Sequence, residues 1–399
     1  MVVKDCPAPV PFGENIGNIV FLTMLFFLSF ISRFIFAPLM PTIEQDLSMS
    51  HAQAGSIFLV AACGNFIGSM GAGFLSSKIN HKGTLVCSTF FVGVMLWTFM
   101  FVSSLGGIRI GIFFLSLASG LNLPSNVATI TAMVRRQDWG KALGVQQLAP
   151  PFSLVMGPIF VVVFLSWFNW RMPLAVLGSI AIVAAFAFAK FGRCGDFAGD
   201  PPSPSLIKSL LGYKSFWIMV VLFALGMGGQ VGIYAMLPLY LVTEHGLSGD
   251  TANTILGLSQ VSCLILTFFA GWLTDRLGEK KVILMVLSVA GLATILMGVL
   301  SGPWLKFLVF LQPALIVCYF PAGFAALSRS VQPNMRGLAS ALVPPTAFII
   351  GGGLLPAILG YMGQTLSFGL GIALFGVLIF LGAGLVFALT LLDKMDPGC

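Results

Sequence analysis

One arginine stands inside a long apolar stretch near the start of the chain. Residues 17–40 read GNIVFLTMLFFLSFISRFIFAPLM, and Arg33 is the only charged residue among them. A helix of this length spans roughly 36 Å, enough to cross a bilayer, which puts Arg33 within about two turns of the midplane. A charge at that depth costs ~2.5 to 3.5 kcal/mol on insertion scales, and such residues commonly mark binding or transport pathways.

The sequence places no acidic side chain where it could neutralise Arg33. All thirteen acids lie outside the apolar stretches, and the nearest on the same helix are Glu44 and Asp46. At the helical rise these two lie roughly 16 to 20 Å away along the axis. An anionic ligand in a water-filled cavity would supply the missing negative charge. The alternative is a structural arginine held by backbone carbonyls or helix C-termini.

The composition is that of a membrane protein built from helices. Charged residues make up 8% of the chain and hydrophobic residues 58%, against about 25% charged in soluble proteins. Apolar runs long enough to cross a bilayer predict an all-α polytopic fold with twelve spans. These spans are residues 17–42, 52–76, 83–104, 107–133, 142–167, 171–192, 215–242, 252–273, 281–300, 303–329, 337–361 and 366–392.

The basic residues predict the orientation of these spans. Sixteen of the twenty lysines and arginines fall in loops and tails on one side, and only Arg109, Arg171 and Lys306 fall on the other. Since short cytoplasmic loops carry the Lys/Arg excess, both termini are expected in the cytoplasm, with the protein in the cell (inner) membrane. The net charge of +7 reflects this topology. Basic residues scattered over several loops, without stacking aromatics, give no reason to expect nucleic acid as a partner.

The sequence shows no cluster of residues that would carry out catalysis or hold a metal. No CxxC motif or His/Cys cluster suggests a metal site, and no cofactor is expected. The predicted exterior loops contain none of the seven cysteines, so no disulfides are expected either. A membrane enzyme or sensor would need a nucleophile and base, a metal cluster or a soluble domain. The sequence therefore argues against an enzyme.

Two segments half a chain apart resemble each other and indicate an internal duplication. Residues 73–83 read GFLSSKINHKG and residues 271–281 read GWLTDRLGEKK, a displacement of 198 residues. Internal repeats of this kind are common in transporters. The predicted organisation is a tail of residues 1–16, a six-helix half of 17–192, a linker of 193–214, a second six-helix half of 215–392 and a tail of 393–399.

The second of these segments resembles the loop signature of the major facilitator superfamily, Gly-x-x-x-Asp-Arg-x-Gly-x-Lys/Arg-Lys/Arg. The matching residues are Gly271, Asp275, Arg276, Gly278, Lys280 and Lys281. The resemblance covers all twelve spans and implies two pseudo-symmetric six-helix bundles that alternate in opening a central cavity to either side. In the first copy, Ser77 stands where the aspartate is expected.

The resemblance also implies a gate on the cytoplasmic side. The aspartate of this loop would latch the two halves together when the cavity opens outward. Asp275 would then bind the N-terminus of the fifth helix near Gly140 and Lys141, favoured by the helix dipole. The predicted gate residues are Asp275, Arg276, Lys280 and Lys141.

The surroundings of Arg33 resemble the organic-anion branch of the superfamily, which couples anion uptake to a cation. The segment SRFIFAPLMPTIEQDL carries this resemblance, with Ser32 where that branch has an aspartate. In this fold helices 1, 4, 7 and 10 are implied to line the cavity. The predicted substrate ligands are Arg33, Ser29, Asn122, Asn126, Gln230, Tyr234, Gln260 and Tyr319. The same amide and hydroxyl groups also serve as interhelical hydrogen bonds, so a structural role stays open.

Two functions fit these features. The first is a secondary or facilitative transporter that binds a small organic anion at Arg33 and works by alternating access as a monomer in the lipid bilayer. The second is an exporter of amphipathic drugs, lipids or a siderophore-like product. All three histidines lie in loops, so proton coupling would have to use groups at the outer rim, and exchange or facilitated transport becomes more credible.

Overall fold

The computed structural model describes residues 11–199, 204–332 and 335–391, and within them the chain is helical without a strand. The helices that precede the linker are α1 (Ile16–Phe34), α2 (Phe36–Asp46), α3 (His51–Thr98), α4 (Leu105–Gly120), α5 (Asn122–Met133), α6 (Trp139–Gln146), α7 (Ala149–Leu165) and α8 (Arg171–Phe191). The helices that follow are α9 (Pro204–Leu211), α10 (Lys214–Met227), α11 (Ile233–Thr243), α12 (Gly249–Leu277), α13 (Glu279–Val299), α14 (Pro303–Ile316), α15 (Tyr319–Arg329), α16 (Arg336–Phe348), α17 (Leu355–Thr365) and α18 (Phe368–Gly382).

The helices account for the predicted membrane spans. Ten helical segments of the described chain are long and apolar enough to cross a membrane. One of them, His51–Phe101, contains two predicted spans, because α3 continues through a kink at Asn80, where φ is 60°. Helix α12 is outside these ten and covers another predicted span. The predicted all-helical polytopic membrane fold is therefore confirmed.

Several spans are broken near their middle. Helix α1 ends at Phe34 and α2 begins at Phe36, so Arg33 lies in the last turn before a break. π-helical turns at Gly228–Gly232 and Ile349–Leu354 interrupt two spans of the second half. Such irregular backbone is tolerated at membrane depth where it is buried in protein or lines a cavity, because neighbouring groups satisfy the freed hydrogen bonds. Arg33 and the π-helical turn at Ile349–Leu354 both lie where the two halves are in contact, the first against Phe348 and the second, through Gly353, against Ala62.

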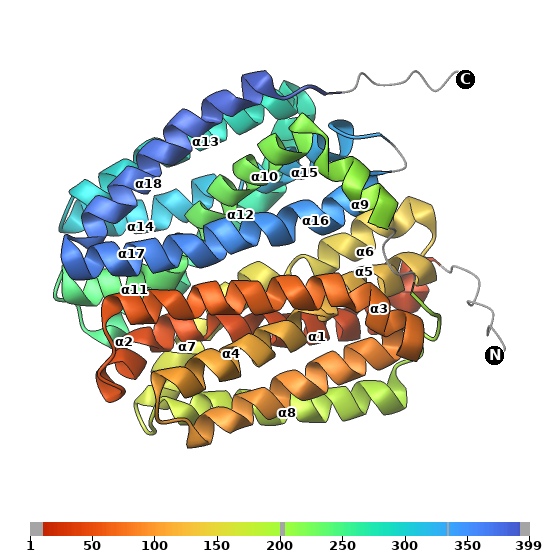
Figure 1. Cartoon of the computed structure of the whole chain (residues 1–399), viewed down its shortest axis with the longest axis horizontal. Coiled ribbons are helices and arrows are strands. Elements are labelled where there is room, and N and C mark those ends of the chain that lie inside the picture. Colours follow the sequence, from red (N-terminus) through yellow and green to blue (C-terminus); the bar gives the residue numbers. More distant parts are fainter. Residues whose placement is uncertain (1–10, 200–203, 333–334, 392–399) are drawn as a thin grey trace.

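The two halves are in close contact at the end of the molecule opposite both termini (Figure 1). A Cβ atom at Gly55 of α3 would lie 2.3 Å from the carbonyl oxygen of Pro356, and one at Gly360 of α17 would lie 2.3 Å from that of His51. Asn253 of α12 donates a hydrogen bond of 3.0 Å to the carbonyl of Pro38. We call these three contacts the distal seal. The two glycine contacts bring backbone against backbone, because glycine lets helices approach closely, and the third joins a side chain to a backbone carbonyl.

The first-half copy of the loop signature binds the start of the linker. The amide of Lys82 donates to the carbonyl of Gly195 at 2.8 Å, and the amide of His81 donates to that of Phe197 at 3.1 Å. Gly195 has φ +86°, a conformation that favours glycine. Cys194 is buried in this contact, and burial raises the pKa of its thiol to about 12. The predicted linker therefore begins as a segment docked on α3 and also contains the short helix α9.

Candidate functional site

Arg33 projects from α1 toward α3, and its side chain makes one hydrogen bond to another described side chain. Its Nη1 donates to Oδ1 of Asn65 at 2.6 Å. The side chain is partly exposed, as is Asn65, although both lie in the interior of membrane-spanning segments. An amide oxygen accepts the hydrogen bond without cancelling the positive charge. The arginine is thus held in place and remains a full cation.

Arg33 takes part in none of the ion pairs found among the described residues. They are Glu44 with His51, Asp138 with Lys141, Asp46 with Arg171 and Glu279 with Arg329. The Nε atom of Arg33 is buried and has no hydrogen-bond partner among the described residues. A guanidinium presents several donors in one plane, which suits the two oxygens of a carboxylate. A hydrogen-bond donor without a partner, next to a positive charge that is not neutralised, is suited to binding an anion.

Three phenylalanines surround the guanidinium. Its central carbon lies 5.4 Å from the ring centroid of Phe30, 5.6 Å from Phe34 and 5.7 Å from Phe348. Phe30 and Phe34 flank Arg33 on α1, whereas Phe348 is the last residue of α16 in the other half. We call these three rings the phenylalanine cage. Cation–π attraction to the ring faces offsets part of the cost of holding the charge away from water.

An exposed stripe along α1 leads from the termini-bearing end toward Arg33. Val20 is 54% exposed and Met24 41%, and Phe27 and Phe30 continue the same face with partial exposure. Helix α1 packs against α3 to α8 of its own half, which leaves this face for the second half. Helix α16 shows a similar row from Gly337 through residues 340–341 and 344–345 to Phe348. Arg33 and Phe348 stand where the two rows meet.

The predicted ligands of the first half are mostly occupied by the protein itself. Ser29 donates to the carbonyl of Ser119 at 3.1 Å. Asn126 donates to the carbonyl of Leu22 at 2.8 Å and accepts from Gln146 at 3.0 Å. Asn122 is fully buried, and its amide atoms have no hydrogen-bond partner among the described residues. Whether any of these residues binds substrate remains a prediction.

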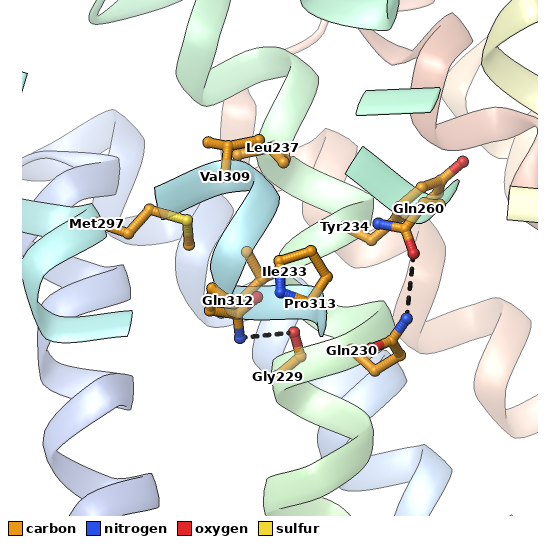
Figure 2. A pocket seen from close by; sticks show the side chains of 10 residues that line it. All are labelled: Gly229, Gln230, Ile233, Tyr234, Leu237, Gln260, Met297, Val309, Gln312 and Pro313. Carbon is orange, nitrogen blue, oxygen red and sulfur yellow. Dashed lines mark hydrogen bonds between the residues drawn. The ribbon is translucent and has the colours of Figure 1, made fainter. Parts of the chain in front are cut away.

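Three predicted ligands of the second half, Gln230, Tyr234 and Gln260, line a small pocket together with Gln312 (Figure 2). Gln230 donates to Gln260 at 3.1 Å, and Gln312 donates to the carbonyl of Gly229 at 3.1 Å. The cavity volume is about 10 Å³, enough for about one water molecule. In this conformation the cluster has room for a water and not for an organic anion.

The remaining predicted ligand, Tyr319, is fully buried among aromatic rings. Tyr234 has a further role, because its hydroxyl donates to the carbonyl of Leu154 across the boundary between the halves at 3.1 Å. Sequence reasoning missed Asn65, Gln312 and the three phenylalanines of the cage. The position of Phe30 three residues before Arg33 was a usable signal, since residues three apart share a helix face. For Phe348, 315 positions away, the sequence contains no such signal.

Comparison with known proteins identifies the family. The family model described as Major Facilitator Superfamily matches residues 22–256 and 229–398. The chain belongs to this superfamily. The predicted family is confirmed, and the chain is a multi-pass membrane transport protein, not an enzyme.

Individual superfamily members resemble the chain over most of its length. A gallate transporter of Pseudomonas putida is 25% identical over 392 residues, covering 86% of this chain and 84% of the relative. A probable nitrate/nitrite transporter of Mycobacterium tuberculosis is 24% identical over 290 residues, covering 69% and 70%. The crystal structure of a bacterial homolog to the human lysosomal transporter Spinster shares the fold, with a TM-score of 0.79, 15% identity and coverage of 94% and 96%.

The predicted gate residues of this superfamily member lie apart from the site at Arg33. Asp275 is exposed, and Arg276 lies over the ring of Trp272 at 4.3 Å. Lys141 pairs with Asp138 of its own half at 3.0 Å. Lys280 is partly exposed at the start of α13. The latch between Asp275 and the region of Lys141 remains a prediction for the conformation in which these helix ends approach.

Proposed function

We propose that this superfamily member carries a small organic anion across the membrane and binds it at Arg33. The observation that carries the proposal is a cation without a carboxylate partner among the described residues, at the meeting point of two exposed helix faces. The names of the two relatives support it, since gallate and nitrate are both anions. A neutral acceptor such as the Oδ1 of Asn65 orients the guanidinium without cancelling the positive charge that would bind the anion.

The proposed mechanism is alternating access with the site at the boundary of the halves. The distal seal closes one end, while the exposed faces of α1 and α16 lead to Arg33 from the end that carries both termini. The distribution of basic residues predicts that this end faces the cytoplasm. The membrane in this proposal is the inner membrane of the cell. The structure then corresponds to the inward-open state. Rocking the halves would open the distal seal and close the cytoplasmic ends.

The energy source in this proposal is exchange or a substrate gradient. A proton-coupled carrier needs a titratable group near its site, usually an acid or a histidine. The groups within hydrogen-bond or cation–π distance of Arg33 in the described structure are an amide and three phenyl rings. None of these takes up a proton. Exchange of the substrate for a second anion, carried in the opposite direction, uses the same site and needs no titratable group.

Anion binding by the purified full-length protein tests the proposal. Small anions are screened by thermal shift, because a ligand that binds only the folded state raises the apparent melting temperature. Arg33→Ala and Arg33→Lys are compared with Arg109→Ala, which removes an arginine bonded to Ser56 at 2.7 Å, away from the cage. Binding should be lost in Arg33→Ala, weakened at least tenfold in Arg33→Lys, and kept in Arg109→Ala. If Arg33→Ala leaves anion affinity unchanged, the proposal fails and an exporter of amphipathic compounds becomes the better hypothesis.

A further inference from the structure

Given the proposed function, the groups that surround Arg33 limit which chemical class of anion the site would bind. Among the described residues, the side-chain groups within hydrogen-bond or cation–π distance of the guanidinium are one amide and three phenyl rings. Asn65 already uses its Oδ1 on Arg33. A bound carboxylate would therefore meet the guanidinium at its charged end and aromatic faces around its body. The site offers few hydrogen-bonding groups for anything beyond the carboxylate.

The cage is itself part of a larger aromatic cluster that joins the halves. Phe30 stacks on Phe34 with ring centroids 4.4 Å apart. Phe34 meets Phe348 edge to face at 6.2 Å and Tyr234 at 6.4 Å. The Tyr234 hydroxyl is committed to the carbonyl of Leu154. Aromatic rings prefer offset-stacked or edge-to-face partners, so another flat ring would extend this cluster in favourable geometry.

The face of α1 that leads to the site is apolar as well. The exposed face of α1 between the termini-bearing end and Arg33 presents Val20, Met24 and Phe27, all apolar and uncharged. Met adapts readily to flat apolar ligands, because its side chain is unbranched and polarizable. A ligand with many hydroxyl groups would pass this face with its polar groups unpaired, which lowers affinity. A bare inorganic anion would leave the apolar surface without a contact.

From these contacts we infer that the transported anion is an aromatic monocarboxylate, with its carboxylate on Arg33 and its ring against the cage of Phe30, Phe34 and Phe348. A sugar acid satisfies the charge and leaves its hydroxyl groups without partners. An inorganic oxyanion satisfies the charge and leaves the rings without a partner. Only the aromatic acid uses both parts of the site.

Isothermal titration of the purified full chain with four probes tests the inference. The probes are benzoate, cyclohexanecarboxylate, glucuronate and nitrate, which vary ring planarity, hydroxylation and the presence of a carbon body. Benzoate should bind at least tenfold more tightly than glucuronate or nitrate, and more tightly than cyclohexanecarboxylate. Equal or tighter binding of glucuronate or nitrate would overturn the inference.

Variants of the cage separate this inference from the proposed function. Phe348→Leu should weaken benzoate binding at least threefold and leave nitrate binding within twofold of wild type. Phe307→Leu, at an exposed position of α14, is the matched control and should change neither. Phe30→Leu provides a second test if Phe348→Leu does not fold. Should Arg33→Ala abolish binding while Phe348→Leu and Phe30→Leu leave benzoate unaffected, the anion site stands and the aromatic class is wrong. Should Arg33→Ala bind benzoate normally, the proposed function itself fails.

Discussion

Arg33 of α1 and Phe348 of α16 meet across the boundary between the two halves, with the guanidinium carbon 5.7 Å from the ring centroid. The contact joins the predicted anion ligand to a residue of the opposite bundle. In the proposed alternating-access cycle the halves rotate against each other, so the geometry of this pair is expected to differ between the two end states. A ligand bound between them therefore contacts both halves, and its binding energy can differ between the states.

Asn65→Asp should weaken anion binding while the fold is kept. The new carboxylate would replace the amide oxygen that accepts from Arg33 at 2.6 Å and would neutralise the guanidinium. We expect affinity to fall at least tenfold, which corresponds to about 1.4 kcal/mol, with little loss of melting temperature. Asn65→Ala is the control, because it removes the hydrogen bond without adding charge. Equal affinities of Asn65→Asp and wild type would argue against Arg33 as the anion ligand.

Gly55→Val should open the distal seal. A Cβ atom at this position would lie 2.3 Å from the carbonyl oxygen of Pro356, so the helices must separate to admit the side chain. The measurement is the distance between spin labels at Gln45 and Asp250, both exposed near the seal. We expect the distance distribution to shift to longer values. Gly71→Val is the matched control on α3, since its Cβ would meet nothing within 4 Å.

Asn126→Ala should lower stability and leave anion affinity intact. Its amide links Leu22 on α1 to Gln146 on α6, and its removal leaves a buried carbonyl and a buried amide without that partner. We expect a loss of about 1 to 2 kcal/mol, measured as a lower melting temperature in detergent. A large loss of affinity at unchanged stability would instead support Asn126 as a substrate ligand.

Cys194 should resist alkylation at neutral pH. Because burial raises the pKa of its thiol to about 12, the reactive thiolate is scarce at pH 8 and its fraction still rises beyond pH 9. The labelling rate, followed by site-resolved mass spectrometry, should therefore keep increasing where an exposed thiol has levelled off. Gly195→Val should raise the rate at pH 8 at least tenfold, since its Cβ would lie 2.9 Å from the Lys82 amide and displace the segment. A labelling rate that levels off near pH 9 in the wild type would show that the thiol is exposed.

The fold and the position of the central cation could be predicted from the sequence because both depend on simple counts. Apolar run lengths predict the spans, and the absence of acids from those runs singles out Arg33. The roles of the neutral polar residues were harder to predict, because an amide such as that of Asn126 serves equally well in hydrogen bonds between helices. Its partners, Leu22 and Gln146, become known only when three helices are placed together. The same holds for Phe348, which reaches the site through packing of the halves.

The docked start of the linker limits how far the two halves can separate at one corner. The chain is fastened to α3 as far as the amide of Gly199, which donates to the carbonyl of Ser76 at 3.2 Å, and α9 begins at Pro204. Five peptide steps reach at most about 18 Å when fully extended. The covalent connection between the bundles is thus short, and in the proposed cycle the two halves can separate at this end of the molecule mainly on the side away from it.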